Sequence, residues 1–309
     1  MNDQTIDRKR RALLQAIGSL PLAAGLARAG TPQDTLRKAI PTSGETLPVI
    51  GIGTSRVFDV GDGEAELRGP LEALAALQSS GNAMIDTSPM YGEAERVIGE
   101  LLPRLPAPPD FFLATKVWID GRRNGIEQMD NSFRLMGVKV IDLMQIHNLV
   151  DWRTHIATLR DWKTRGRIRY IGITHYHRGA HQELMRVMQA LPDLDFVQVN
   201  YSLLEPEAAQ HLLPMAQERS VAVIANRPFG GGRWFGMTRT HPLPDWVEAL
   251  GIDSWAQFAL KWVVSHPAIT CAIPGTGNAK HMLDNMQAGR GILLDAQTRG
   301  RMQRLIREL

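Results

Sequence analysis

The sequence predicts a single (β/α)8 TIM barrel of the α/β class, and three observations carry this prediction. Short apolar runs alternate with helical stretches, and eight such units fill roughly 240 residues, as this fold requires. The runs are rich in β-branched residues and bounded by polar ones, which is typical of strands buried on both faces. Several runs end in a polar or ionisable residue, as strands do at the active face of a barrel.

An open, doubly wound sheet shares much of this pattern. It usually carries a glycine-rich nucleotide-binding loop after its first strand. The corresponding segment here, residues 51–56, has two of the three glycines and lacks the third. The barrel is therefore favoured.

The eight predicted strands cover residues 49–53, 83–85, 111–114, 141–146, 168–173, 196–199, 221–225 and 269–273. Apolar residues spaced three and four apart predict helices over residues 67–78, 94–102, 126–136, 156–164, 182–191, 208–218, 255–264 and 298–308. Two segments fall outside this repeat. Residues 35–47 are expected to cap the barrel floor, and residues 227–252 form a long connection of the kind that is often functional.

The first 29 residues differ in composition from the rest of the chain. Arg10 and Arg11 precede a mildly apolar stretch over residues 12–26, which is too short and too polar for a membrane span. Ala27 and Ala29 then provide the small residues of a signal-peptidase cleavage site. This arrangement resembles a twin-arginine export signal.

We therefore expect residues 1–29 to be a signal peptide for the twin-arginine export machinery, and residues 30–309 to form the barrel in the periplasm. A cytoplasmic protein with a basic amphipathic N-terminal helix is the alternative. The leader also explains the net charge of +3, because it holds five of the 35 basic and two of the 32 acidic residues. The remaining chain is formally neutral, so the charge does not indicate nucleic-acid binding, which needs a basic face on the folded domain.

The rest of the composition is that of a globular protein, with 44% hydrophobic and 22% charged residues. Its one cysteine, Cys271, excludes an intramolecular disulfide and any cysteine-rich zinc site. Because Cys271 lies in an apolar run, we expect a small buried side chain.

Polar residues end most of the predicted strands. Asp86 ends the second strand, Lys116 the third and His147 the fourth. Because the carboxyl ends of barrel strands meet at one face, we expect these three side chains to share a centre. The later strand ends carry Thr174 and His175, Gln198 and Asn200, Asn226 and Arg227, and Gly275 and Thr276.

Four passages in this order resemble the aldo-keto reductase family. They are residues 85–95 with Asp86 and Tyr91, residues 114–118 with Lys116, residues 143–147 ending in His147, and residues 273–276 followed by Asn285. Their order and spacing hold over most of the chain after the leader. One such motif would be weak evidence, whereas four in order are strong.

The resemblance implies hydride transfer from a nicotinamide cofactor to the carbonyl carbon of an aldehyde or ketone, with Tyr91 giving a proton to the oxygen as general acid. A free tyrosine has a pKa of about 10, and a nearby cation lowers that value. Lys116 is the expected cation, and Asp86 is expected to hold it by a charge-assisted contact. His147 is expected to donate a hydrogen bond to the substrate oxygen and orient it.

The residues that contact the cofactor in this family are only partly matched in this sequence. Gln198 matches the glutamine beside the nicotinamide, and Asn285 matches the asparagine that reaches the adenine. Thr174 and His175 occupy the positions of the family's Ser-Asn pair. The aromatic residue that usually stacks on the nicotinamide in this family is replaced around Arg227. The guanidinium plane of Arg227 can serve in that role.

The choice of nucleotide depends on four positions near the last strand. Many family members hold the 2′-phosphate of NADPH with a lysine and an arginine, and these positions are Gly275 and His281 here. Thr276 and Lys280 lie nearby and can bind a phosphate. We therefore expect NADPH, with NADH as the alternative.

The substrate is expected to be a small carbonyl compound. Trp118 is expected to line its pocket, although packing in the barrel is an alternative role for this residue. Arg227, Trp234 and Phe235 on the long connection are expected to cover the pocket. We expect the protein to be a monomer without a metal ion.

Two other functions are compatible with the sequence. His175 and His177 have ligand-like spacing, and with Asp86 and His147 they would form the site of a metal-dependent barrel hydrolase. A barrel that binds NADP without catalysis, as a sensor or partner subunit, is the second. Carbonyl reduction is favoured because all four catalytic side chains are present and the hydrolase has no role for Lys116.

Overall fold

The computed structural model describes residues 35–106 and 110–309. The predicted signal peptide lies outside the described residues. Within the described part of the chain, no helix combines the length and the apolar character that crossing a membrane requires.

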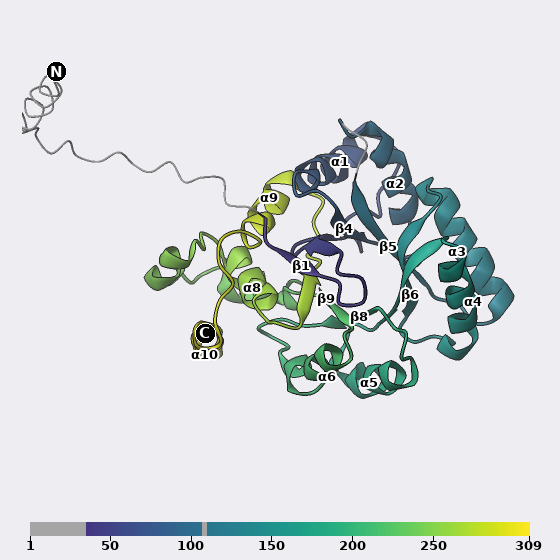
Figure 1. Ribbon diagram of the computed structural model, residues 1–309. Coiled ribbons are helices and arrows are strands. Elements are labelled where there is room, and N and C mark those ends of the chain that lie inside the picture. The colour runs from purple at the N-terminus through teal and green to yellow at the C-terminus, as the bar shows by residue number, and fades with distance from the viewer. Residues whose placement is uncertain (1–34, 107–109) are drawn as a thin grey trace, which may run out of the picture. The chain divides into compact units, whose positions relative to one another are not determined.

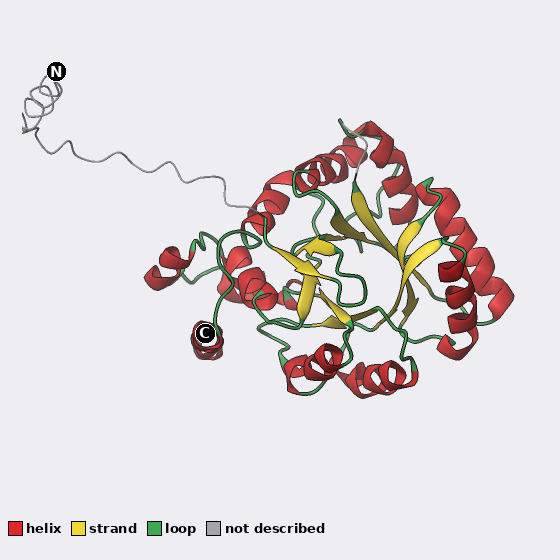
Figure 2. Ribbon diagram, in the orientation of Figure 1, coloured by secondary structure: helices red, strands yellow, loops and turns green. Residues whose placement is uncertain are grey.

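Eight parallel strands form the central sheet and are hydrogen-bonded in the order in which they occur along the chain. They are β3 (Ile52–Gly53), β4 (Ala83–Asp86), β5 (Phe111–Val117), β6 (Ile141–His147), β7 (Ile168–Thr174), β8 (Phe196–Asn200), β9 (Ala222–Asn226) and β10 (Ile269–Ala272). Parallel bridges join Ile50 to Ala272 and Gly53 to Gly275, so the first strand also meets the last. The predicted (β/α)8 barrel is confirmed, and Figure 2 shows its strands ringed by helices.

The helices pack around the outside of the strands (Figure 1). They are α1 (Glu64–Gln78), α2 (Ala94–Leu101), α3 (Arg122–Met136), α4 (Trp152–Thr164), α5 (His181–Ala190), α6 (Leu212–Glu218), α7 (Arg233–Thr238), α8 (Trp255–Val264), α9 (Ala279–Gln287) and α10 (Ala296–Glu308). The predicted helix over residues 208–218 is interrupted, because His211 leaves the helical region with a φ of −141°. A short 3-10 turn, η3 (Glu207–Gln210), therefore precedes α6.

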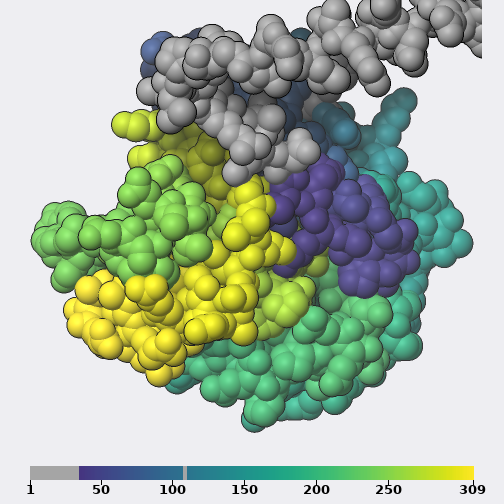
Figure 3. Space-filling model, turned by 60° about the vertical axis from the view of Figure 1, so that its left-hand side comes forward, coloured from purple at the N-terminus to yellow at the C-terminus, as the bar shows by residue number. Residues whose placement is uncertain are grey.

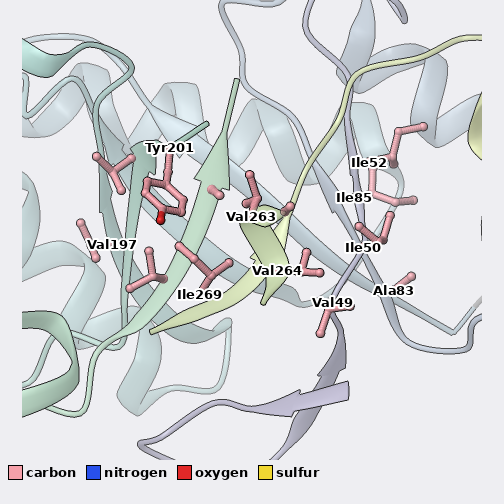
Figure 4. Packing of buried hydrophobic residues seen from close by; sticks show 14 of the residues in the cluster. Val49, Ile50, Ile52, Ala83, Ile85, Val197, Tyr201, Val263, Val264 and Ile269 are labelled. Carbon is pink, nitrogen blue, oxygen red and sulfur yellow. The ribbon is translucent and has the colours of Figure 1, made fainter. Parts of the chain in front are cut away.

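Two apolar cores lie on the two sides of the strands. The inner core fills the barrel with side chains from alternate strand positions: Met84, Phe112, Ala114, Leu143, Tyr170, Phe196, Ala222, Ile224, Cys271 and Ile273. Cys271 is thus the small buried residue that the sequence predicts. The outer core packs strands against helices, and Figure 4 labels Val197 and Ile269 from the strands and Val263 from α8.

A two-stranded hairpin lies across the N-terminal end of the barrel (Figure 1). Its strands β1 (Arg37–Ala39) and β2 (Thr46–Pro48) pair antiparallel. Ile40 and Leu47 of the hairpin are completely buried and belong to the inner core. The expectation that residues 35–47 cap the barrel floor is confirmed.

Polar contacts attach this hairpin to the barrel. Lys38 Nζ donates to three main-chain carbonyl oxygens between the end of α8 and the start of β10, at 2.7, 2.8 and 2.8 Å. The Tyr170 hydroxyl donates to Glu45 Oε2 at 2.7 Å. The Leu36 amide donates to the Gly289 carbonyl oxygen at 2.7 Å, and Figure 3 shows the purple hairpin beside the yellow C-terminal residues. The C-terminal ends of the strands lie at the opposite end of the barrel.

Candidate active site

Asp86 and Lys116 form a buried ion pair at the C-terminal end of the strands. Neighbouring strands β4 and β5 bring them together, with Lys116 Nζ 2.7 Å from Asp86 Oδ2. The ammonium also donates to the Thr87 carbonyl oxygen at 2.6 Å. Burial acts to lower the pKa of Lys116, but the Asp86 carboxylate and Tyr91 raise it above its ordinary value. Lys116 is therefore a fixed cation, as a buried charge requires partners of this kind.

The second oxygen of Asp86 accepts two further hydrogen bonds, from Gln145 Nε2 at 3.0 Å and from Gln198 Nε2 at 2.8 Å. Gln145 is absent from the predicted site. Its position two residues before His147 was a usable signal, because alternate residues of a strand face the same side. Gln198, predicted to contact the nicotinamide, directs its amide nitrogen to Asp86, and Thr174 Oγ1 donates to its amide oxygen at 3.2 Å.

Tyr91 lies on the loop between β4 and α2 and is half-buried. Its ring centroid is 5.0 Å from Lys116 Nζ, and the ring meets that of His147 edge-on at 5.9 Å. Burial raises the pKa of Tyr91, and the opposing effect of Lys116 does not cancel this shift. The expectation that Lys116 brings this pKa below its ordinary value is wrong for this structure, because burial outweighs the cation. Tyr91 is a neutral phenol that keeps its proton at neutral pH.

His147, at the end of β6, is neutral in this environment. It is 5% exposed, and burial together with repulsion from Lys116 and His175 lowers its pKa to about 2. A neutral imidazole has one N–H donor and one bare nitrogen. Its Nδ1 lies 3.0 Å from Ser88 Oγ, a contact with no counterpart among the predicted site residues.

Trp118 follows β5 and stands at the mouth of the site. It is 40% exposed, and its ring centroid is 6.3 Å from that of His147. Gln128 of α3 fixes its main chain, because the Trp118 amide donates to Gln128 Oε1 at 2.6 Å and Gln128 Nε2 donates back at 3.3 Å. This location is consistent with the predicted role in substrate binding, which stays a prediction.

A cavity of about 420 Å³ opens between the segments that follow β6 and β7, and its lining begins at Asn148, the residue after His147. It is lined by Asn148, Leu149, Asp151, Trp152, Arg153, His175, Ala180 and Glu183. Three of these residues, Asn148, Leu149 and Asp151, have a positive φ of 52°, 59° and 43°. Such a backbone is unfavourable for residues other than glycine and is often found where a loop serves a function.

The long connection after β9 covers less of the substrate pocket than expected. Trp234 is 1% exposed and donates from Nε1 to the Trp255 carbonyl oxygen at 2.8 Å. The expectation that Trp234 covers the pocket is wrong, because its ring packs in the outer core. Phe235 is exposed and contacts the Phe229 ring at 4.8 Å.

His175 and Arg227 lie on the two strand ends next to Gln198. The Tyr176 amide donates to His175 Nδ1 at 3.0 Å, and burial lowers the pKa of His175 to about 4. Arg227 is exposed and donates from Nη1 to the Tyr176 carbonyl oxygen at 3.4 Å. Their predicted contacts with a nicotinamide stay predictions. Within the described ranges, no group of three or more histidine, cysteine or acidic residues is arranged to hold a metal ion.

The remaining predicted cofactor residues lie between β10 and the end of α9. Gly275 is exposed, whereas Thr276 and Asn285 are buried. The Thr276 hydroxyl accepts a hydrogen bond from the Asn278 amide at 3.1 Å, which closes the turn before α9. The predicted contact of Asn285 with an adenine stays a prediction.

Lys280 and His281 are both exposed in the first turn of α9. Asn278 Oδ1 caps this helix by accepting from their main-chain amides at 2.9 and 3.3 Å. Neither side chain forms an ion pair with the described residues. The positive end of the helix and two unpaired basic side chains can bind a phosphate.

The geometry of these residues agrees with the outcome of the sequence comparison. The model of the Aldo/keto reductase family matches residues 49–307. The chain belongs to this family. The family members to which it is similar are oxidoreductases by name.

Aldo-keto reductase YhdN of Bacillus subtilis (strain 168) is 25% identical over 201 residues, and the alignment covers 60% of each protein. The NADH-specific methylglyoxal reductase of Escherichia coli (strain K12) is 23% identical over 248 residues, covering 69% of this chain and 73% of that protein. An aldo/keto reductase from Klebsiella pneumoniae, solved in complex with NADP and acetate, superposes with a TM-score of 0.74 at 26% identity. That match covers 89% of this chain and 95% of the other.

Proposed function

We propose that this protein is an NAD(P)H-dependent carbonyl reductase acting on a small aldehyde or ketone, with Tyr91 as its general acid. The observation that carries the proposal is the position of the Tyr91 ring between two groups. Its centroid lies 5.0 Å from Lys116 Nζ and 5.9 Å from the centroid of the His147 ring. A proton donor, a cation and a hydrogen-bond donor then meet at one point of the mouth. These are the groups that a carbonyl oxygen needs as it gains negative charge.

Each of these side chains has a defined task in the reaction. Tyr91 enters protonated, because its pKa is raised, and gives its proton to the carbonyl oxygen. The Lys116 ammonium stabilises the phenolate that remains, and Asp86 keeps the ammonium in position. His147 is neutral and orients the carbonyl oxygen through one ring N–H.

We propose NADPH as the cofactor, and when bound it supplies the hydride. The described residues fit such a group, because the first turn of α9 presents Lys280 and His281 without acidic partners. Phosphate groups bind well at such helix ends. The NADP complex of the Klebsiella relative supports the same choice, whereas the NADH specificity of the Escherichia relative keeps NADH as the alternative.

The cavity between the segments that follow β6 and β7 is the proposed site for the remainder of the substrate. Asn148 lines this cavity, and its buried Oδ1 has no hydrogen-bond partner among the described residues. A carbonyl compound with a hydrogen-bond donor on its tail would satisfy this oxygen.

The direct test is oxidation of NADPH by the purified protein with a panel of reactive aldehydes, followed by absorbance. We expect turnover by the wild type and a loss of at least about 100-fold in Tyr91→Phe, as for removal of a general acid. Tight NADP binding without turnover by either protein would instead support a non-catalytic sensor or partner subunit. Stoichiometric zinc together with hydrolase activity would support the metal-dependent alternative.

We also propose that residues 1–29 direct export to the periplasm through the twin-arginine machinery. Arg10 and Arg11, the apolar stretch and the alanines before residue 30 support this. Fractionation of cells that produce the C-terminally tagged full chain tests it. We expect the wild type in the periplasm and a variant with both arginines changed to lysine in the cytoplasm.

A further inference from the structure

Ser88 is a completely buried residue that contacts two of the proposed catalytic groups. Its side-chain oxygen lies 3.0 Å from His147 Nδ1. Its main-chain carbonyl oxygen accepts a hydrogen bond from the Tyr91 amide at 3.0 Å. Ser88 thereby connects the loop that carries Tyr91 with the end of β6.

The direction of the Ser88–His147 hydrogen bond follows from the donors that surround the hydroxyl. A serine hydroxyl has one hydrogen and two lone pairs. The Met90 amide, which can only donate, lies 3.4 Å from Ser88 Oγ and uses a lone pair. His147 Nδ1 is the remaining partner within the described residues, so it is the acceptor available to the Ser88 hydrogen. If Nδ1 carried the proton instead, the buried Ser88 hydroxyl would have no acceptor, which is unfavourable.

The ring proton of a neutral histidine resides on one nitrogen only. With Nδ1 accepting from Ser88, this proton must reside on Nε2, which makes no hydrogen bond to the described residues. The ring centroids of Tyr91 and Trp118 lie 5.9 and 6.3 Å from that of His147, and neither ring takes a hydrogen bond from Nε2. The Nε2 proton is therefore available to the substrate.

We propose that Ser88 is a positioning residue that fixes His147 in the tautomer with its proton on Nε2, ready to donate to the carbonyl oxygen. The inference rests on the proposed function for its effect on rate. The tautomer itself is a property of the free protein. A carbonyl oxygen can use only a donor, so a His147 ring with a bare Nε2 would repel the oxygen that it has to orient.

Nitrogen-15 NMR of histidine-labelled protein at neutral pH reads the tautomer directly, because protonated and bare ring nitrogens differ strongly in shift. His147 is assigned from the signal that is lost in His147→Gln. We expect one form with Nε2 protonated in the wild type and in Ser88→Thr, which keeps a hydroxyl. Ser88→Ala should show a mixture of both tautomers, with kcat lower by about fivefold, the size of one hydrogen bond, and an unchanged Kd for NADPH.

Ser265→Ala is the matched control. Ser265 is also buried, and its hydroxyl accepts from the Leu294 amide at 2.9 Å, so the variant loses a comparable hydrogen bond. It should keep the wild-type tautomer and kcat. A wild-type His147 protonated on Nδ1 would overturn the proposal, and so would a Ser88→Ala spectrum identical to that of the wild type. If the wild type reduces no aldehyde, the proposed function fails, but the spectra still decide the role of Ser88.

Discussion

The Glu95 carboxylate of α2 accepts a 2.5 Å hydrogen bond from the hydroxyl of Thr115 on β5, directly behind the catalytic face. Its second oxygen lies 3.1 Å from Ser132 Oγ on α3, and the whole side chain is 1% exposed. Burial raises the pKa of Glu95, while the two hydroxyls and Lys116 oppose that shift. One carboxyl group thus ties the helix that follows Tyr91 to the strand that carries Lys116.

Thr115→Val should therefore impair catalysis from outside the barrel. The substitution keeps the shape of the side chain but removes the donor to Glu95, so the spacing of Tyr91 and Lys116 is loosened. We expect kcat to fall about tenfold with little change in KM, since small misplacements of reacting groups are costly. Thr270→Val, which removes a buried hydroxyl that accepts from the Val223 amide, is the control and should keep its kcat. Equal kcat values in the two variants would contradict this role of Glu95.

The pH profile of reduction should be flat on its acidic side. His147, with a pKa of about 2, stays neutral across the working range. Tyr91 must be protonated to act as an acid, and its pKa is raised above the ordinary 10.0, so activity should be lost only as the pH rises past that value. Measuring kcat/KM between about pH 5 and pH 11 covers both groups. An inflection near the ordinary histidine pKa of 6.5 would show that His147 titrates, against this expectation.

Lys280→Ala should weaken the binding of NADPH but not that of NADH. If Lys280 contacts the 2′-phosphate, its loss weakens NADPH binding about tenfold, as for a hydrogen bond to a charged group, and leaves NADH binding unchanged. Fluorescence titration with each nucleotide gives both Kd values. Lys139→Ala removes an exposed lysine from the turn between α3 and β6 and should alter neither. Equal weakening of both nucleotides by Lys280→Ala would exclude a specific phosphate contact.

His147 should make the fold sensitive to acid. Its pKa is about 2 when folded, against an ordinary value of 6.5. Below about pH 6.5 the unfolded chain binds a proton that the folded chain does not, so the free energy of unfolding decreases by about 1.4 kcal/mol per pH unit from this group. Urea denaturation at pH 7, 6 and 5 should show a shallower decrease for His147→Gln than for the wild type. Parallel decreases in the two proteins would rule out this contribution.

The strand ends were predictable from the sequence because one simple rule governs them. Parallel strands end at the same face, so Asp86, Lys116 and His147 had to converge once their strands were recognised. The same alternation leads to Gln145, two residues before His147. The capping hairpin was predictable in position, because residues 35–47 precede the first strand and fall outside the strand–helix repeat.

Contacts that depend on packing between elements were not predictable. Ser88 and His147 are far apart in the sequence, and only the path of the loop after β4 brings them together. The pKa of Tyr91 depends on a balance between burial and a cation, and the sequence gives no measure of burial. The expected position of Trp234 over the pocket is wrong because its indole N–H donates to a main-chain acceptor in the core, which removes the usual reason for a tryptophan to stay at the surface.

The hairpin across the barrel floor has a consequence for the proposed export. The described chain begins at Thr35, which bridges Arg290 at the floor, whereas the first turn of α9 and the proposed catalytic groups occupy the opposite end. Under the proposed function, the end of the barrel that takes up the cofactor stays open while its floor is closed, so a folded precursor can carry bound reductant through the proposed export route.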